Sequence, residues 1–285
     1  MDALKVRAYG KINLTLNVVG RRADGFHNIS TIFQSIALQD TLILRRRSGG
    51  IKIEVKGATL PDGPGNLVYQ AAILLQQRYG FPGVHISLIK RIPVAAGLGG
   101  GSSDAAATLV GLNYLYDLGL TPLQLAREGA ELGSDVPFCV LGGTALGRGR
   151  GEELCLLPPS PGLWLVLVKP SFGVSTAAVY QRWDTAPYRQ NPEPPDEGKA
   201  VAALKAGDRE QLIEALGNDL EIVTCHLYPE VRDIKIKLLS AGAKRAVLCG
   251  SGPTVFGVAP DREKAFTIAA RLQQDYPETI VTSTL

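Results

Sequence analysis

A glycine-rich stretch, Pro93 to Ser103 with the sequence PVAAGLGGGSS, constrains this chain more than any other feature. It follows an apolar, β-branched run at 84–92 and precedes an Ala- and Leu-rich segment at 104–116, which predicts a tight loop between a strand and a helix. Because glycine lacks a Cβ, such a loop can turn sharply and bring several N–H groups close to one anion. The positive N-terminal end of the following helix adds to this. The stretch therefore predicts a phosphate-binding loop.

Two familiar phosphate loops do not match the stretch. The P-loop places a Lys after its last Gly, and none stands there. The dinucleotide-binding pattern G-x-G-x-x-G fails because Ser102 occupies its third glycine position. What remains is the pattern P-x-x-x-G-L-G-G-G-S-S, with a plain glycine-rich turn and a serine N-cap as the structural alternative.

Composition favours a packed globular protein. The 285 residues are 45% hydrophobic and 20% charged, which suits one large or two ordinary domains. A net charge of +3 is too small to indicate nucleic-acid binding. The four cysteines show no C-x-x-C pair and no zinc-site spacing, and no signal peptide or membrane span is visible. We therefore expect a cytoplasmic protein without nucleic-acid or membrane partners.

The amino-terminal half mixes strands and helices. Strand patterns lie at 4–9, 12–19, 31–37, 41–46 and 51–55. The turn residues Ser48-Gly49-Gly50 predict a hairpin between the last two of these strands. A helix is expected at 66–79, and Thr121 is expected to start another, with Pro122 in its first turn.

The carboxy-terminal half continues the mixed order. It shows strands at 164–169, on both sides of 249–253 and at 279–283, with several helices including one at 261–275. This order indicates an α+β fold. The Pro-rich stretch at 158–162 suggests a boundary between domains 1–157 and 158–285, and the prolines at 186–198 suggest a surface loop.

Three further stretches each allow a functional and a plain structural interpretation. In AYGKINL, Lys11 stands within a strand pattern, and an exposed strand lysine is the alternative. In LGSDVPFCV, Asp135 precedes Pro137, and a carboxylate that caps a turn is the alternative. In LCGSGPTVF, the second glycine-rich turn is equally readable as an ordinary hairpin. Each stretch alone leaves the choice open.

Together the four stretches resemble one family in sequence and order. The loop resembles the phosphate loop of the GHMP kinases, and the other stretches resemble members of that family in the non-mevalonate isoprenoid pathway. The resemblance spans 8–257, and its most specific part is R-x-D-G-F-H at 22–27. Those members usually carry Tyr before the His, where this chain has Phe26. The resemblance implies a two-domain α+β GHMP kinase fold with the active site in the inter-domain cleft.

The resemblance also implies a reaction. The γ-phosphoryl group of ATP would pass to the 2-hydroxyl of a cytidine diphosphate-linked methylerythritol. Asp135 would accept the hydroxyl proton or orient the hydroxyl, and Lys11 would keep the carboxylate ionised and stabilise charge on the phosphoryl oxygens. Mg²⁺ is expected with ATP, bound largely through phosphates and water, since no acidic pair has plain ligand spacing. A monomer and a homodimer are both compatible with the chain.

The binding residues follow from the same resemblance. The residues implied for ATP are Asn66, Pro93, Val94, Ala95, Ala96, Gly97, Leu98, Gly99, Gly100, Gly101, Ser102 and Ser103. Those implied for the substrate are Asn13, Phe26, His27, Tyr180, Gly250, Ser251 and Gly252. Phe26 and Tyr180 would stack on the two faces of the cytosine, and His27 would read its edge. Tyr180 is equally explained as a helix core residue.

Two other functions remain as alternatives. A GHMP kinase for another small alcohol, such as homoserine or mevalonate, predicts no use for Phe26, His27 and Tyr180. A nucleotide-binding sensor without turnover has no need for a base, so the presence of both Lys11 and Asp135 speaks against it.

Overall fold

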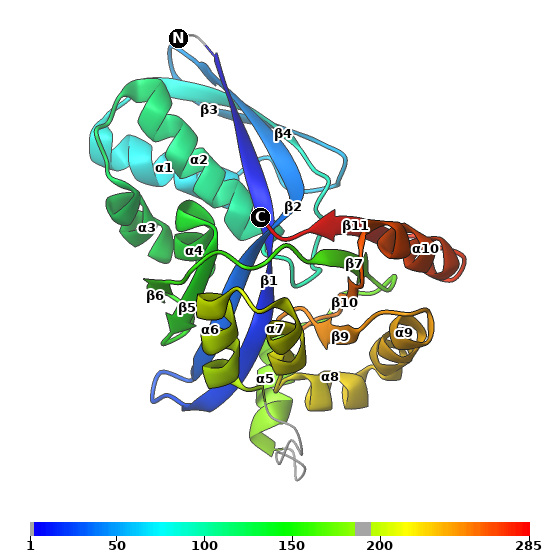
Figure 1. The fold of residues 1–285 in the computed structure, drawn as a ribbon. Coiled ribbons are helices and arrows are strands. Elements are labelled where there is room, and N and C mark those ends of the chain that lie inside the picture. Colours follow the sequence, from blue (N-terminus) through cyan, green and yellow to red (C-terminus); the bar gives the residue numbers. More distant parts are fainter. Residues whose placement is uncertain (1–2, 186–194) are drawn as a thin grey trace. The chain divides into compact units, whose positions relative to one another are not determined.

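The computed structural model describes residues 3–185 and 195–285, which divide into two compact units (Figure 1). The first unit holds residues up to Lys11, Leu38–Val94 and Gly99–Gly142. The second holds Ile12–Ala37, Ala95–Leu98 and the chain from Gly143 on. Two long strands, β1 (Ala3–Arg21) and β2 (His27–Arg46), contribute residues to both units. The division into domains at residue 157 stays a prediction.

The sheet of the first unit corrects one sequence expectation. Strand β4 (Gly83–Ile89) pairs in parallel with β3 (Gly50–Lys56) and antiparallel with the last part of β2. The predicted hairpin between 41–46 and 51–55 is therefore wrong, because β4 lies between these two strands. The apolar strand β4 lies between β2 and β3, and β3, which carries more charged residues, takes the edge.

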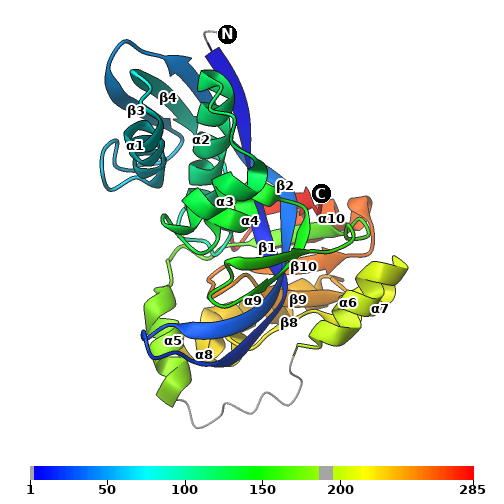
Figure 2. The same cartoon turned by 90° about the vertical axis from the view of Figure 1, so that its left-hand side faces the viewer.

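Helices α1 (Leu67–Tyr79) and α2 (Gly100–Tyr116) cover one face of this sheet (Figures 1 and 2). The core between them contains the buried apolar residues Leu42, Leu44, Ile86, Leu88, Ala71, Leu75, Ala105 and Leu109. Burying this many apolar side chains, at roughly 1.5–3 kcal/mol for each large one, supplies most of the driving force for the unit. The core fixes α2, and with it the end of the glycine-rich stretch.

Two shorter helices complete the first unit. Helix α3 (Pro122–Ala130) begins as predicted, with a capping box between Thr121 and Gln124. Helix α4 (Val136–Leu141) follows directly after Asp135. Helix α2 begins at Gly100, earlier than the expected start at residue 104, so the last glycines and both serines form its first turn.

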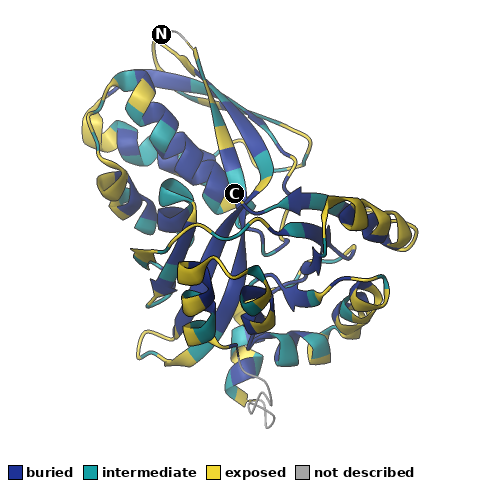
Figure 3. Cartoon of the chain, viewed as in Figure 1, coloured by how far each residue is buried: buried dark blue, intermediate teal, exposed yellow. Residues whose placement is uncertain are grey.

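The second unit contains a four-stranded antiparallel sheet. Its strand order is β11 (Thr279–Ser283), β7 (Trp164–Val168), β10 (Val255–Ala259) and β9 (Arg245–Leu248). Helices α9 (Pro229–Ser240) and α10 (Arg262–Leu272) pack against it and bury one face each, with their other faces exposed (Figure 3). The hairpin of β9 and β10 around 249–253 is confirmed.

The remaining elements of the second unit are short. They comprise β5 (Thr144–Arg148), β6 (Glu153–Leu156), β8 (Gly217–Asn218), α5 (Thr176–Thr185), α6 (Glu197–Ala206), α7 (Arg209–Ala215) and α8 (Glu221–Leu227). Strand β5 pairs with β2, and β8 pairs in parallel with β1. Most of the predicted surface loop at 186–198 lies outside the described residues. Within the part of the chain that is described, no helix is long and apolar enough to cross a membrane.

Candidate active site

Lys11 and Asp135 meet in the first unit. The Lys11 Nζ lies 3.2 Å from the Asp135 Oδ2, with side-chain exposures of 6% and 31%. The alternative of an exposed strand lysine is therefore wrong. Asp135 occupies the N-cap position of α4, yet its side chain makes no capping hydrogen bond. The carboxylate thus reaches solvent with a buried lysine against it.

Cys139 lies one helical turn after Asp135. Burial raises the pKa of the Cys139 thiol far above its ordinary value, and the negative charge of Asp135 raises that pKa further. Its backbone N–H donates to the Asp135 carbonyl at 3.1 Å. The thiol therefore stays protonated at neutral pH.

The glycine-rich stretch takes a backbone that few residues other than glycine allow. The φ angles of Ala95, Gly97 and Gly99 are 52°, 76° and 67°. A Cβ on Gly97 would lie 2.3 Å from the carbonyl oxygen of Cys249. A Cβ on Gly99 would lie 2.8 Å from the Cγ of Lys11. Both positions therefore require glycine, because φ is positive and because a Cβ would come too close to a neighbouring atom.

The first turn of α2 is not capped by a serine. Gly99 is the N-cap residue, without a side-chain hydrogen bond, so the serine N-cap alternative is wrong. The Ser103 hydroxyl is buried and donates to the carbonyl of Tyr9 at 2.6 Å. The N–H groups of Gly100, Gly101 and Ser102 belong to the first helical turn and have no intrahelical partner by geometry.

Asn66 serves as the N-cap of α1. Its Oδ1 accepts from the Val68 N–H at 2.9 Å, and its Nδ2 donates to the Pro61 carbonyl at 2.8 Å. The side chain is buried. These bonds fix the loop before α1, and the contact with ATP implied for Asn66 stays a prediction.

Sequence reasoning missed a buried charge cluster beside the glycine-rich stretch. The Lys90 Nζ lies 2.5 Å from Asp40 and 2.7 Å from Asp104, and all three side chains are almost fully buried. Asp40 accepts the N–H groups of Arg91 and Ile92, just before the loop, and Asp104 lies in α2 directly after its first turn. The cluster therefore ties the two ends of the loop together. Its sequence signal was a lysine within the apolar run at 84–92.

Asp104→Asn should flatten the pH dependence of stability. Burial raises the pKa of Asp104 to about 8, against the lowering effect of Lys90. Since an unfolded Asp has a pKa of about 3.9, the folded state holds a proton that the unfolded state has lost, and stability falls as pH rises from about 4 to 8. Asn resembles the protonated acid and removes this loss. Urea unfolding at several pH values measures it, and equal slopes in both proteins would contradict it.

His27 and Tyr180 come together in the second unit. Their ring centroids are 4.8 Å apart with an interplanar angle of 26°. The His27 Nε2 lies 2.7 Å from the Oδ1 of Asp184, a residue that sequence reasoning missed. Tyr180 also packs at the edge of a small apolar core, so the two interpretations of this residue are compatible. Phe26 is 54% exposed and has the guanidinium of Arg150 5.1 Å from its ring centroid.

The second glycine-rich turn is held by side chains that sequence reasoning also missed. The Asn218 amide donates to the carbonyls of Leu248 at 2.9 Å and Gly250 at 2.7 Å. The hydroxyls of Ser251 and Thr176 are 2.8 Å apart. This turn is both a hairpin and a rigid, polar loop. The substrate contacts implied for Gly250, Ser251 and Gly252 stay predictions.

Asn13 is buried in β1, and its Nδ2 donates to the Thr31 hydroxyl at 2.8 Å. The substrate contact implied for it also stays a prediction.

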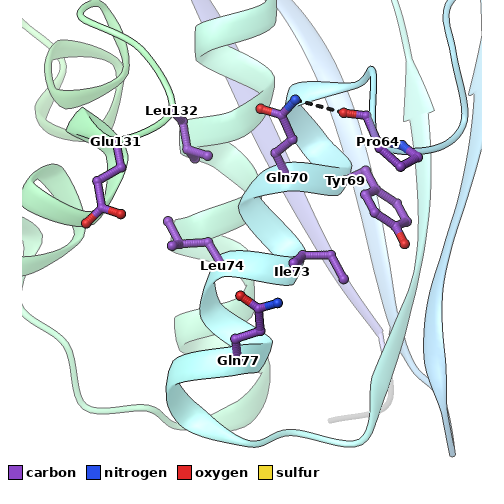
Figure 4. Close-up of a pocket in the computed structure, with 8 residues that line it drawn as sticks. All are labelled: Pro64, Tyr69, Gln70, Ile73, Leu74, Gln77, Glu131 and Leu132. Carbon is purple, nitrogen blue, oxygen red and sulfur yellow. Dashed lines mark hydrogen bonds between the residues drawn. The ribbon is translucent and has the colours of Figure 1, made fainter.

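A pocket of about 300 Å³ opens in the first unit (Figure 4). It is lined by Pro64, Tyr69, Gln70, Ile73, Leu74, Gln77, Glu131 and Leu132. The Gln70 amide donates to the Pro64 carbonyl at 2.8 Å on its rim. Its lining includes none of the residues implied for ATP or substrate, so this pocket is separate from the predicted site residues.

Family models match both halves of the chain. The model of the GHMP kinases N terminal domain matches residues 66–143, and that of the GHMP kinases C terminal matches residues 200–278. Together the matched segments contain most of the glycine-rich and acidic residues described above. They support the fold and the kinase class.

Individual relatives are more specific. The chain is 68% identical to the 4-diphosphocytidyl-2-C-methyl-D-erythritol kinase of Moorella thermoacetica, with 100% of both chains covered. It is 52% identical to the enzyme of that name from Pelotomaculum thermopropionicum, covering 97% of this chain and 96% of the relative.

Solved structures agree with these relatives. A crystal structure of 4-(cytidine 5'-diphospho)-2C-methyl-D-erythritol kinase matches with a TM-score of 0.85 and 34% identity, covering 99% of both chains. A homoserine kinase from Cytophaga hutchinsonii matches with a TM-score of 0.76 at 20% identity, covering 100% of this chain and 95% of that one, which shows the shared fold alone. The chain therefore belongs to the 4-diphosphocytidyl-2-C-methyl-D-erythritol kinases of the GHMP kinase superfamily.

Proposed function

We propose that this chain transfers the γ-phosphoryl group of ATP to the 2-hydroxyl of 4-diphosphocytidyl-2-C-methyl-D-erythritol, with Asp135 as the base. The observation that carries the assignment is the pairing of Asp135 with buried Lys11 at 3.2 Å. A cation at this distance stabilises the ionised carboxylate, which can then accept the hydroxyl proton as the hydroxyl oxygen attacks. The same cation can stabilise charge that develops on the phosphoryl oxygens.

The phosphate loop fits a triphosphate. The first-turn N–H groups of α2 and the positive end of its dipole suit an anion. The positive φ angles of Ala95, Gly97 and Gly99 give a backbone that presents N–H groups rather than side chains. We assign residues 93–103 to the ATP phosphates on this basis, and Asn66 to the neighbourhood of the nucleoside.

Mg²⁺ is proposed to arrive with ATP and to be held mainly by phosphate oxygens and water. Among residues 3–185 and 195–285, no group of three or more His, Cys, Asp or Glu side chains is placed to hold a metal ion. Mg²⁺ keeps several waters and dehydrates reluctantly, so it needs no such cage. When bound, the ion neutralises phosphate charge, and the protein contributes positioning.

The cytidine end is assigned to Phe26, His27 and Tyr180. Phe26 has an exposed aromatic ring. Tyr180, on α5, stacks against the ring of His27. Aromatic stacking on a base contributes roughly 1–3 kcal/mol and does not depend on the identity of the base. Discrimination between cytosine and other nucleobases would therefore depend on the hydrogen bonds of His27.

Replacing both aromatic residues should weaken substrate binding alone. We expect Phe26→Ala combined with Tyr180→Ala to raise KM for the cytidine substrate by about 10- to 10³-fold, since one to two stacks are lost. KM for ATP should stay within about twofold because no aromatic face of this pair is assigned to ATP. Steady-state kinetics with each substrate varied in turn measures both values. An unchanged KM for the cytidine substrate removes both residues from the site.

The choice of alcohol is tested by ADP release. The enzyme is given ATP and Mg²⁺ with, in parallel, the diphosphocytidyl methylerythritol substrate, mevalonate, homoserine or galactose. Turnover with the first alone is the expected result. Turnover with another alcohol would leave the proposed roles of Lys11 and Asp135 in place but would contradict the proposed cytidine-binding site. If none of the four alcohols gives ADP release, the nucleotide-binding sensor is favoured.

We also propose a cytoplasmic enzyme that is a monomer or a homodimer. All four cysteines are free thiols, which suits a reducing compartment. Light scattering at several protein concentrations distinguishes the two assemblies. A larger oligomer would contradict the proposal.

A further inference from the structure

Helix α5 presents two residues to His27 in a fixed position. Val179 and Trp183, one turn apart, are buried in a small apolar core. Tyr180 directly follows Val179, and Asp184 directly follows Trp183. These two residues therefore also lie one turn apart, on the helix face next to the buried one. Tyr180 stacks on the His27 ring, and Asp184 accepts at its edge. The imidazole is thus held from two directions.

The contact with Asp184 sets the proton position on His27. Its Oδ1 lies 2.7 Å from the His27 Nε2, with side-chain exposures of 18% and 6%. Its Oδ2 lies 3.5 Å from the Nε of Arg21, so the carboxylate contacts a guanidinium on its other side. An ionised carboxylate only accepts hydrogen bonds, so Nε2 must carry a hydrogen. In the neutral imidazole the other nitrogen, Nδ1, is then an acceptor.

Nδ1 is the atom through which His27 can meet a ligand. Among the described residues, none donates a hydrogen bond to it. An acceptor at this place suits an amino group, such as the 4-amino group of cytosine. Uracil carries a carbonyl oxygen at the same position, and two acceptors facing each other leave both unpaired.

We propose that Asp184 is a positioning residue that fixes the Nε2–H tautomer of His27, so that Nδ1 selects cytosine over uracil. The inference deepens the proposed function and rests on its assignment of His27 to the cytidine end. Arg21 takes part by holding the second carboxylate oxygen of Asp184. In this role Asp184 acts through His27 and does not itself contact the substrate.

The tautomer is measured directly by nitrogen-15 NMR of the wild-type protein. The chain has three histidines, and His27→Asn identifies the signals of His27 by their loss. We expect a protonated Nε2 and an unprotonated Nδ1 at neutral pH. A protonated Nδ1, whether in a neutral or in a doubly protonated ring, would overturn the proposal, and this result does not depend on turnover.

Selection is measured with Asp184→Ala. We expect KM for the cytidine substrate to rise about tenfold or more, with kcat and KM for ATP within about twofold. KM for the uridine counterpart should hardly change, so the preference for cytidine falls by the same factor. Gln181→Ala, on the same helix and exposed, is the matched control and should behave as wild type.

The outcomes separate the two proposals. If Asp184→Ala keeps the full preference while wild-type enzyme turns over the cytidine substrate normally, the role of Asp184 is wrong and the proposed function stands. If wild-type enzyme does not use the cytidine substrate, the proposed function is wrong, and the selection of cytosine by His27 fails with it. Thermal unfolding of Asp184→Ala confirms that its kinetics belong to a folded protein.

Discussion

Asp135→Asn is expected to lower kcat by about 10²- to 10⁴-fold, which is the usual contribution of a positioned general base. The amide keeps the shape of the carboxylate but cannot take a proton at neutral pH. KM for ATP and for the cytidine substrate should stay within a few-fold because binding is left to other residues. Steady-state and single-turnover kinetics measure the chemical step separately from product release. Nearly intact turnover would show that Asp135 only orients the hydroxyl.

The matched control for this variant is Asp117→Asn. Asp117 is exposed and ends α2 with a φ of 53°. Asn adopts this left-handed backbone readily, so the same chemical change there should leave both stability and turnover unchanged. A comparable loss of kcat in Asp117→Asn would point to a general effect on the protein.

Gly97→Ala is expected to lower kcat/KM for ATP by about 10²-fold, because a shift of about 1 Å in a positioning element can cost that much. The new Cβ would lie 2.3 Å from the Cys249 carbonyl oxygen, a backbone atom that cannot swing away. The φ of 76° adds a conformational cost of about 1–2 kcal/mol for a residue with a Cβ. The loop, the turn or both must move. Kinetics with varied ATP measures the effect.

Gly119→Ala separates the two costs. Gly119 has a φ of 70°, and a Cβ there would meet no atom within 4 Å. This variant therefore carries the backbone cost without the collision. We expect a small loss of stability and normal turnover. If Gly97→Ala matches Gly119→Ala in both, the close packing of the loop on Cys249 has no part in catalysis.

Local patterns predicted most of the elements. The apolar periodicity and the caps at Asn66 and Thr121 located α1 and α3, and alternating apolar residues located the longer strands. The short strands β5, β6 and β8 were not predicted. The family and its ATP-dependent kinase activity, predicted from four short stretches, are confirmed by the comparisons. These stretches are informative because all four resemble one family and occur in the same order along the chain.

Strand pairing was harder to predict. The turn residues Ser48-Gly49-Gly50 suggested a hairpin, but they only show that the chain changes direction there. Strand β4 is more apolar than β3, and its burial between β3 and β2 outweighs the local preference for a hairpin. Such a choice depends on residues far along the chain.

The site residues that sequence reasoning missed were missed for the same reason, because their partners lie far away in the sequence. Asp184 meets His27 across 157 positions of sequence, and Lys90 meets Asp40 across 50. Neither aspartate stands in a recognisable motif, and each becomes significant only when the fold brings it to a partner. The pairing of Lys11 with Asp135 was implied by resemblance, and the structure supplies its distance and its burial.

Phosphorus-31 NMR of the reaction product tests the central claim most directly. The second carbon of the methylerythritol carries the methyl group and no hydrogen, whereas the other hydroxyl-bearing carbons carry hydrogen. Phosphoryl transfer to the 2-hydroxyl therefore predicts a new phosphomonoester signal without splitting by carbon-bound hydrogen, formed in step with ADP. A split signal would place the phosphoryl group on another hydroxyl. The absence of any new signal, with mevalonate or homoserine phosphorylated instead, would contradict the proposed function.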